Sequence, residues 1–152
     1  MCDPYLQCER GYRRSFAGHL DMDHVEIRYF GQNNLRSGIE LVNLGDAGFN
    51  VSVTNSVMNR GYFTAIDVHA TNGCLIHGNT IFRSHLPTLR VASGDGNVVS
   101  ENLAIVSIFW HTHRGAIQGK GLAKEKLNAM IGAFHDSGTR SMIHRNIAAG
   151  NE

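Results

Sequence analysis

Four stretches of the chain repeat one pattern, a short run of apolar and β-branched residues followed by asparagine. They read FNVSVTNSVM (residues 49–58), GCLIHGNTIF (residues 73–82), GNVVSENLAI (residues 96–105) and RSMIHRNIAA (residues 140–149). The asparagines are Asn55, Asn79, Asn102 and Asn146, at steps of 24, 23 and 44 residues. A weaker first copy, HLDMDHVEI (residues 19–27), has His24 in the place of the asparagine.

A second pattern lies between successive copies of the first. It is an apolar alternation that closes on glycine, and it reads GIELVNLGD (residues 38–46), AIDVHATNG (residues 65–73), TLRVASGDG (residues 88–96) and MIGAFHDSG (residues 130–138). A repeat of this size cannot bury its apolar face alone, so the repeats must stack. The recurrence of both patterns at one period predicts a parallel β-helix. The alternative is a β-sandwich, whose strands recur every ~8–12 residues.

The predicted fold class is all-β, a single-stranded parallel β-helix of about five coils over residues 19–152, after an N-terminal segment of residues 1–18. Two interior ladders are expected, one of Ile39, Ile66, Leu89 and Ile131 and the other of Leu41, Val68, Val91 and Ala133. The last step is long because about 19 residues are inserted, roughly residues 108–127. This excursion ends in LAKEKLNAM, which has helix-forming composition.

The composition excludes several classes of protein. The chain has 152 residues, a formal net charge of +1 and 42% hydrophobic residues, which suits one folded domain. Such a balanced charge gives no support for binding nucleic acid or an anionic membrane. No apolar run approaches the ~18 residues of a membrane span, and the N-terminus lacks the apolar region of a secretory signal. No Walker, GxSxG or HExxH motif occurs, and no cofactor is expected.

The repeat region resembles a known family. TAIDVHATNGCLIHGNTIF (residues 64–82) and LRVASGDGNVVSENLAIVSIF (residues 89–109) are similar to the parallel β-helix region of the fibrocystin-L and fibrocystin (polyductin) family. HVEIRYFGQ (residues 24–32) resembles the segment that leads into those coils. The resemblance runs over residues 18–146 and implies a right-handed, pectin-lyase-like β-helix, a hand that parallel crossovers generally prefer.

The resemblance also implies a function. Such a chain would be an extracellular segment of a large, membrane-anchored cell-surface receptor or scaffold protein, related to hyaluronan-degrading proteins. Those proteins are far longer and have a signal peptide, Ig-like repeats and a membrane span, so this chain looks like an excised segment. Its open coil ends would be unpaired edges, and we expect them to self-associate.

The hyaluronan-degrading branch carries a histidine-rich strand where this chain reads GIELVNLGD. The expected function is therefore a non-catalytic face that binds a glycan or an extracellular protein. The alternatives are a hyaluronan-type glycosidase or polysaccharide lyase, and a purely structural spacer.

Stacking is expected to place Glu40, Asp67, Arg90 and Gly132 in one outward column, with His69 and Ala92 in the next. Two neighbouring carboxylates should raise the pKa of one of them, and an arginine should lower the pKa of Asp67. Because a carboxylate pair can cleave glycosides, Glu40, Asp67, His69 and Arg90 are the catalytic candidates. The alternative, which we favour, is a surface ion ladder between coils.

The repeated asparagines have a structural interpretation. Asparagine tolerates left-handed backbone and bonds its own turn. Stacked at one corner, Asn55, Asn79, Asn102 and Asn146 are expected to form an amide ladder. His24, His77 and His144 are expected near the same turns, with structural hydrogen bonds.

The remaining candidates are weaker. His111 and His113 would face one side of an extended segment and could start a metal site, with His135 or His85 as third ligand; the alternative is a solvated loop. The sequon Asn50-Val51-Ser52 makes Asn50 a glycosylation candidate in an extracellular protein. Cys2, Cys8 and Cys74 are an odd number of cysteines, so at least one is unpaired within the chain, and none is expected to bind metal.

Overall fold

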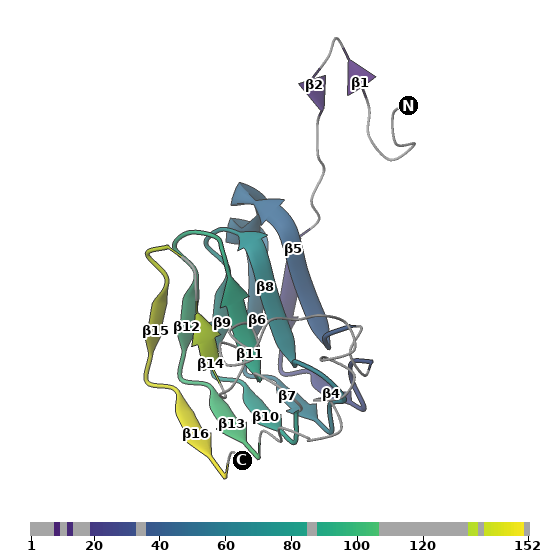
Figure 1. Cartoon of the computed structure of the whole chain (residues 1–152), viewed down its shortest axis with the longest axis vertical. Helices are drawn as coiled ribbons and strands as arrows, with labels where there is room; N and C mark the ends of the chain where they lie inside the picture. The colour runs from purple at the N-terminus through teal and green to yellow at the C-terminus, as the bar shows by residue number, and fades with distance from the viewer. Residues whose placement is uncertain are drawn as a thin grey trace, which may run out of the picture.

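The computed structural model describes residues 8–9, 12–13, 19–32, 36–84, 88–106, 134–136 and 139–150 (Figure 1). The elements in chain order are β1 (Cys8–Glu9), β2 (Tyr12–Arg13), β3 (Leu20–Asp23), β4 (Glu26–Arg28), β5 (Ile39–Gly45), the 3-10 helix η1 (Asp46–Asn50), β6 (Val51–Thr54), β7 (Val57–Asn59), β8 (Ile66–Thr71), β9 (Leu75–His77), β10 (Thr80–Phe82), β11 (Leu89–Ala92), β12 (Val98–Ser100), β13 (Leu103–Ile105), β14 (Phe134–Asp136), β15 (Met142–His144) and β16 (Ile147–Ala149).

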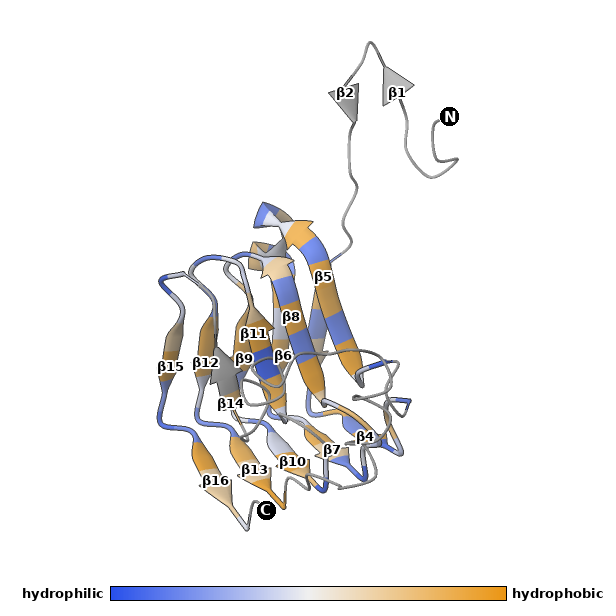
Figure 2. Ribbon diagram, viewed as in Figure 1, coloured by the Kyte–Doolittle hydropathy of each residue, from blue (hydrophilic) through white to orange (hydrophobic). Residues whose placement is uncertain are grey.

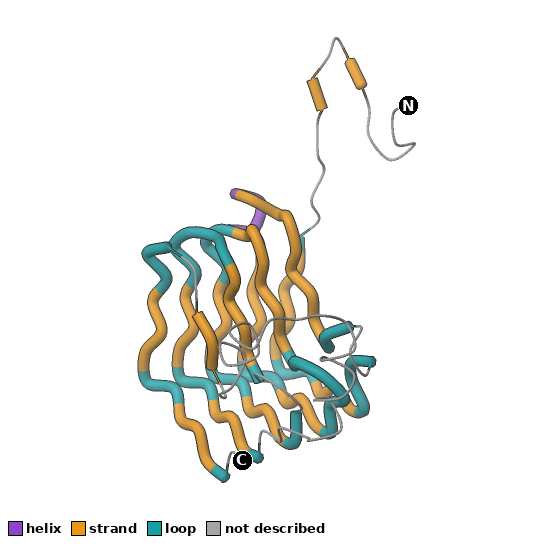
Figure 3. The backbone as a smooth tube through the Cα atoms, in the orientation of Figure 1, coloured by secondary structure: helices purple, strands orange, loops and turns teal. Residues whose placement is uncertain are grey.

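Apart from the antiparallel pair β1 and β2, the described strands form three parallel sheets. The strand orders are β15-β12-β9-β6-β3, β16-β13-β10-β7-β4 and β14-β11-β8-β5. Successive coils therefore add one strand to each sheet, and equivalent strands and turns lie next to one another (Figure 3). This all-β parallel solenoid agrees with the predicted fold class. A β-sandwich is excluded, because sandwich sheets are antiparallel.

The coils follow the expected period where the chain is regular. Val53 pairs with Ile76, and Ile76 with Val99, at steps of 23 residues. The first coil is longer, because Met22 pairs with Val53 over 31 residues. The last step, from Val99 to Ile143, is 44 residues and contains the predicted insertion. Residues 108–127 of that insertion lie outside the described residues.

Apolar and polar residues alternate along β5, β8 and β11, as their hydropathy bands show (Figure 2). Both predicted interior ladders are buried through their first three positions, Ile39, Ile66, Leu89 and Leu41, Val68, Val91. Burying one such side chain contributes about 1.5–3 kcal/mol. Because each coil adds only a few of them, the core is continuous only when coils stack.

The fourth position of each predicted ladder is wrong. Leu89 pairs with Phe134 instead of Ile131, and Val91 pairs with Asp136 instead of Ala133. Phe134 packs against the hydrophobic core, so a large aromatic side chain sets the register where the chain returns from the insertion. Counting back from the repeat could not locate this strand, because the insertion has no periodic pattern.

Candidate functional site

Glu40, Asp67 and Arg90 lie side by side on β5, β8 and β11, and we call them the acid–arginine column. Arg90 Nε donates to Asp67 Oδ1 at 2.8 Å, and Arg90 Nη2 donates to Oδ2 at 2.6 Å. The Asp67 side chain is only 11% exposed and that of Arg90 28%. The planar guanidinium matches both carboxylate oxygens, so this pair ties two coils together.

Glu40 has partners of its own at the start of its strand. Its carboxylate accepts from the Ser37 backbone N–H at 2.8 Å and from Arg36 Nη1 at 3.0 Å. The Ser37 N–H chiefly lowers the pKa of Glu40, with help from Arg36 and against the opposing effect of burial. Glu40 is therefore not a carboxyl with a raised pKa, which the general acid of a glycosidase requires.

The remaining members of the predicted column are placed differently. His69 lies exposed on β8 between Val42 and Ala92, as the spacing predicts, and within the described residues no hydrogen bond or ion pair joins it to Asp67. Gly132 was expected beside Arg90, but the register places His135 there, for the reason given for Phe134. Within the described residues, this face presents paired side chains and no poised acid–base pair.

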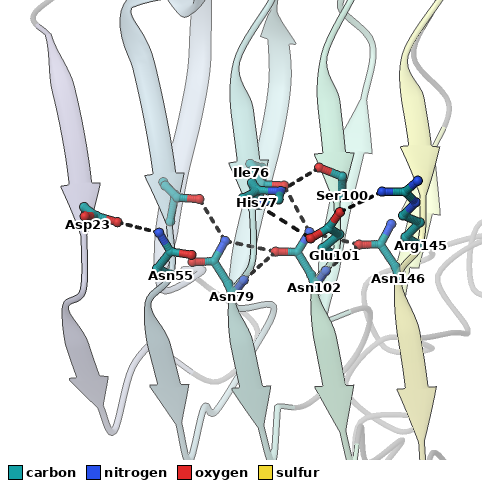
Figure 4. Close-up of polar contacts among 11 residues, drawn as sticks. Asp23, Asn55, Ile76, His77, Asn79, Ser100, Glu101, Asn102, Arg145 and Asn146 are labelled. Atoms are coloured by element: carbon teal, nitrogen blue, oxygen red, sulfur yellow. Dashed lines mark hydrogen bonds and ion pairs between the residues drawn. The ribbon is translucent and has the colours of Figure 1, made fainter.

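An amide ladder of Asn79, Asn102 and Asn146 lies at the corner between the first two sheets (Figure 4). Asn102 Oδ1 accepts from both the backbone N–H and Nδ2 of Asn79, each at 3.0 Å. Asn146 Oδ1 accepts from the corresponding atoms of Asn102 at 2.9 and 3.0 Å. Each Nδ2 also donates to a carbonyl of the preceding coil, such as that of Ile76 under Asn102. Buried amides with this many partners are structural groups.

Asn55 does not belong to this ladder, which corrects the sequence prediction. Ser56 occupies the ladder position, because its N–H donates to Asn79 Oδ1 at 3.0 Å and its Oγ accepts from the Val25 N–H at 3.1 Å. Asn55 instead has φ 46° and donates from Nδ2 to Asp23 Oδ1 at 2.9 Å. The sequence does indicate this shift, because the step from Asn55 to Asn79 is 24 residues, one more than the 23-residue period.

The residues just before the ladder form a second column at the same corner, and all have left-handed backbone: His24, Asn55, Gly78, Glu101 and Arg145. Four residues of this region interact across coils (Figure 4). His77 Nδ1 lies 2.9 Å from Ser100 Oγ, and His77 Nε2 lies 3.9 Å from Glu101 Oε2. Arg145 Nη1 donates to Glu101 Oε1 at 3.2 Å.

A serine, a histidine and a glutamate in line suggest a catalytic triad, but two observations argue against it. Ser100 is 4% exposed, so its hydroxyl is withdrawn from solvent. Glu101 is paired with Arg145 and does not approach His77 within hydrogen-bond distance. Ser100 and Glu101 were not predicted from the sequence, although their 23-residue spacing from His77 and Gly78 marks them as neighbours.

Among the predicted cysteines and the candidate metal-binding histidines, only Cys74 has a described side chain, and its role is structural. Cys74 is buried, and burial raises the pKa of its thiol to about 11, so it is unreactive at neutral pH. Its backbone N–H donates to Asn97 Oδ1 at 3.1 Å, an asparagine bridge that was not predicted from the sequence. Cys2, His85, His111 and His113 lie outside the described residues, and of Cys8 and His135 only the backbone is described.

A shallow hollow of about 250 Å³ lies beside β3, β6 and β9. Its lining residues come from three coils, and they are His19, Asp21, Phe49, Asn50, Val51, Ser52, Gly73 and Leu75. The hollow arises because η1 replaces the tight turn found at this corner of the next coil. Gly48 allows η1 to approach closely, since a Cβ there would lie 2.2 Å from the Asn72 carbonyl oxygen.

The glycosylation candidate Asn50 is exposed at the end of η1 and lines this hollow. The sequon serine, Ser52, donates from its hydroxyl to Asp21 Oδ1 on the neighbouring strand. Sequence reasoning gave no reason to place Asp21 or Phe49 in a site, because their proximity depends on the longer first coil.

Within the described residues, no group of three or more His, Cys, Asp and Glu side chains could hold a metal ion. Among those residues, too, no helix is long and apolar enough to cross a membrane. Comparisons with protein-family models, curated proteins and solved structures found no match for this chain.

Proposed function

We propose that this chain is a non-catalytic binding segment, a right-handed parallel β-helix from a fibrocystin-L-like cell-surface protein. The observation that carries the proposal is the pairing of the acid–arginine column. Asp67 is held in two short hydrogen bonds to Arg90, and Glu40 is held by Ser37 and Arg36. The carboxylates that a glycosidase or lyase would need are thus already paired, Asp67 across two coils and Glu40 within its own coil.

The handedness, the location, the family and the partner are each supported by a different argument. Right-handed winding is supported by the general preference of parallel crossovers for that hand. The extracellular location and the family are supported by the sequence resemblance alone. The proposed partner is a glycan or an extracellular protein, and open coil ends would allow self-association. Stacked coils suit such a role, because they present rigid side-chain columns on a continuous surface.

Exposure to high-molecular-weight hyaluronan tests the non-catalytic assignment. The chain, checked for β structure by circular dichroism, is incubated with the polymer, and polymer size is followed by light scattering. We expect no change with the wild type, with Asp67→Asn, or with Asp95→Asn, whose carboxylate pairs with Arg140 elsewhere on the surface. Shortened polymer with the wild type and with Asp95→Asn, but not with Asp67→Asn, would overturn the proposal in favour of an enzyme.

A binding segment and a spacer differ in whether any ligand is recognised. Immobilised chain is therefore tested against a panel of neutral and anionic oligosaccharides. Saturable binding to a member of the panel supports the proposal. Absence of binding across the panel, with the fold intact, removes the glycan arm and favours a spacer or a protein partner.

A further inference from the structure

The hollow beside η1 has polar groups that are not all paired with one another. Asp21 Oδ1 accepts from the Ser52 hydroxyl, while Asp21 Oδ2 has no partner among the described residues. His19 and Asn50 are exposed on the same rim. A carboxylate oxygen can accept hydrogen bonds from the hydroxyl groups of a ligand, and a neighbouring amide can donate to them.

Phe49 supplies the apolar wall of the hollow. Its side chain is 68% exposed, although an aromatic ring of this size gains most from burial. The ring leans on Gly73, where an added Cβ would lie 2.2 Å from Phe49 Cδ1 and Cε1. Gly73 has φ +69°, so this position both requires glycine and leaves room for the ring. Phe49 is thus held in place from one side and open on another.

The size and charge of the hollow limit its ligand. About 250 Å³ is below the ~300–1,000 Å³ of pockets that enclose a whole cofactor, so the hollow admits one ring of a larger molecule. Among its lining residues Asp21 is the acidic group, and neither lysine nor arginine is present. A uronate or sulfate would therefore meet the like charge of Asp21, with no lysine or arginine among these lining residues to offset it.

We propose that this hollow is a subsite for one pyranose ring of a neutral glycan. The apolar C–H face of the sugar packs on Phe49, and ring hydroxyls donate to Asp21 Oδ2 and bond with Asn50. This inference deepens the proposed binding function and rests on it. It specifies the ligand class as neutral and disfavours hyaluronan, whose repeating carboxylates face the charge of Asp21.

The test uses the full chain made without glycosylation and labelled with ¹⁵N. Maltohexaose, cellohexaose and chitohexaose are the neutral probes, and a hyaluronan hexasaccharide is the anionic one. We expect a neutral probe to shift the amide resonances of Phe49, Asn50, Ser52 and Gly73. The Phe49→Ala variant should bind that probe at least about tenfold more weakly, while Phe49→Tyr keeps the affinity.

The matched control is Tyr62→Ala, which removes another exposed aromatic ring that does not line the hollow. It should leave the affinity unchanged. Asp21→Asn should admit the hyaluronan hexasaccharide, because it removes the repelling charge. Phe49→Ala is expected to fold, since most of its side chain is exposed, and circular dichroism checks this.

Three outcomes would overturn the inference. These are the absence of shifts with every neutral probe, affinity that Phe49→Ala does not change, and tighter binding of the hyaluronan hexasaccharide by the wild type. Glycan binding that maps to other residues would refute the hollow as a glycan subsite but would still agree with the proposed function. Shortening of hyaluronan would instead overturn the proposed function, whatever the hollow binds.

Discussion

The amide ladder and the acid–arginine column are built by the same stacking of coils but use it differently. In the ladder, neutral groups are buried and every donor of Asn79 and Asn102 has a protein acceptor. In the column, charged side chains pair near the surface, where Arg90 and Glu40 are partly exposed and Asp67 is only 11% exposed. A buried amide that loses its partner carries the full cost of desolvation, whereas water partly replaces a lost surface partner. We therefore expect the buried amide ladder to contribute more to the stability of the fold than the acid–arginine column.

Asn102→Ala should give the largest effect. It removes the acceptor of the Asn79 N–H and one of the two acceptors of Asn79 Nδ2. It also removes the Nδ2 donor of the Ile76 carbonyl and of Asn146 Oδ1, which keeps only the backbone N–H of residue 102. Several unsatisfied buried groups are expected to cost about 3–5 kcal/mol in the free energy of unfolding. Urea denaturation followed by circular dichroism measures the loss.

Two variants serve as controls for Asn102→Ala. Asn102→Ser places the residue found at the ladder position of an earlier coil, Ser56, and should lose less than Asn102→Ala. Asn55→Gly removes an exposed asparagine next to the ladder while keeping the left-handed backbone, as Gly78 does one coil later. Its unfolding free energy should change by no more than about 0.5 kcal/mol. Equal losses for Asn102→Ala and Asn55→Gly would refute the ladder's role.

Arg90→Gln probes the acid–arginine column and should give an intermediate effect. It leaves the largely buried Asp67 carboxylate without its two strongest hydrogen bonds. We expect a loss of about 1–3 kcal/mol in the free energy of unfolding. The control is Arg140→Gln, which breaks a similar bidentate pair whose side chains are 79% and 35% exposed, and which should lose under about 1 kcal/mol. A larger loss for Arg140→Gln than for Arg90→Gln would contradict the expectation that breaking the more buried ion pair lowers the unfolding free energy more.

Ser56→Ala tests the corrected position of the ladder. Ser56 is 1% exposed, and its Oγ accepts from the Val25 N–H and donates to the Thr54 carbonyl. Losing these bonds is expected to lower the unfolding free energy by about 1–2 kcal/mol, more than Asn55→Gly. If Asn55→Gly were the more damaging of the two, the originally predicted position would be correct.

Much of the fold could be predicted because hydrophobic periodicity and a 23-residue repeat constrain each other. A slip of one residue within a strand would expose every core side chain, so the inward ladders of Ile66 and Val68 were readable from sequence. Turns lack this constraint. Asn55 and Ser56 are both polar and both suit a corner, so residue type alone could not say which of them stacks on Asn79.

The parts that escaped prediction depend on segments without a repeat. Phe134 returns from an insertion, and the position of its strand is set by packing of the ring. The hollow needs the 31-residue first coil and η1, which bring Phe49 close to Asp21. From sequence, Phe49 looked like the start of a strand, because a 3-10 turn of five residues has no periodic signature.

Asp23→Asn should give the smallest effect, which is seen as a weaker dependence of stability on pH between about 4 and 2. Hydrogen bonds from Thr54 first, then Asn55 and His24, lower the pKa of Asp23 from 3.8 to about 2. Since the folded-state pKa lies below the unfolded one, the stabilisation is fully present above about pH 4 and is lost as the pH falls through about 2. Asp23 is exposed, so water screens the effect, and the urea midpoint should fall only slightly less in Asp23→Asn than in the wild type across this window.

Thr54→Val tests whether the Thr54 hydroxyl is the main cause of the lowered pKa of Asp23. It removes the hydroxyl that lowers the pKa of Asp23 most, while keeping a β-branched residue in β6. The pKa of Asp23, followed by carboxyl NMR, should rise toward its ordinary value. An unchanged pKa would mean that the Asn55 amide suffices. Asn55 would then have an electrostatic role at the exposed corner, one residue away from the buried ladder that it does not join.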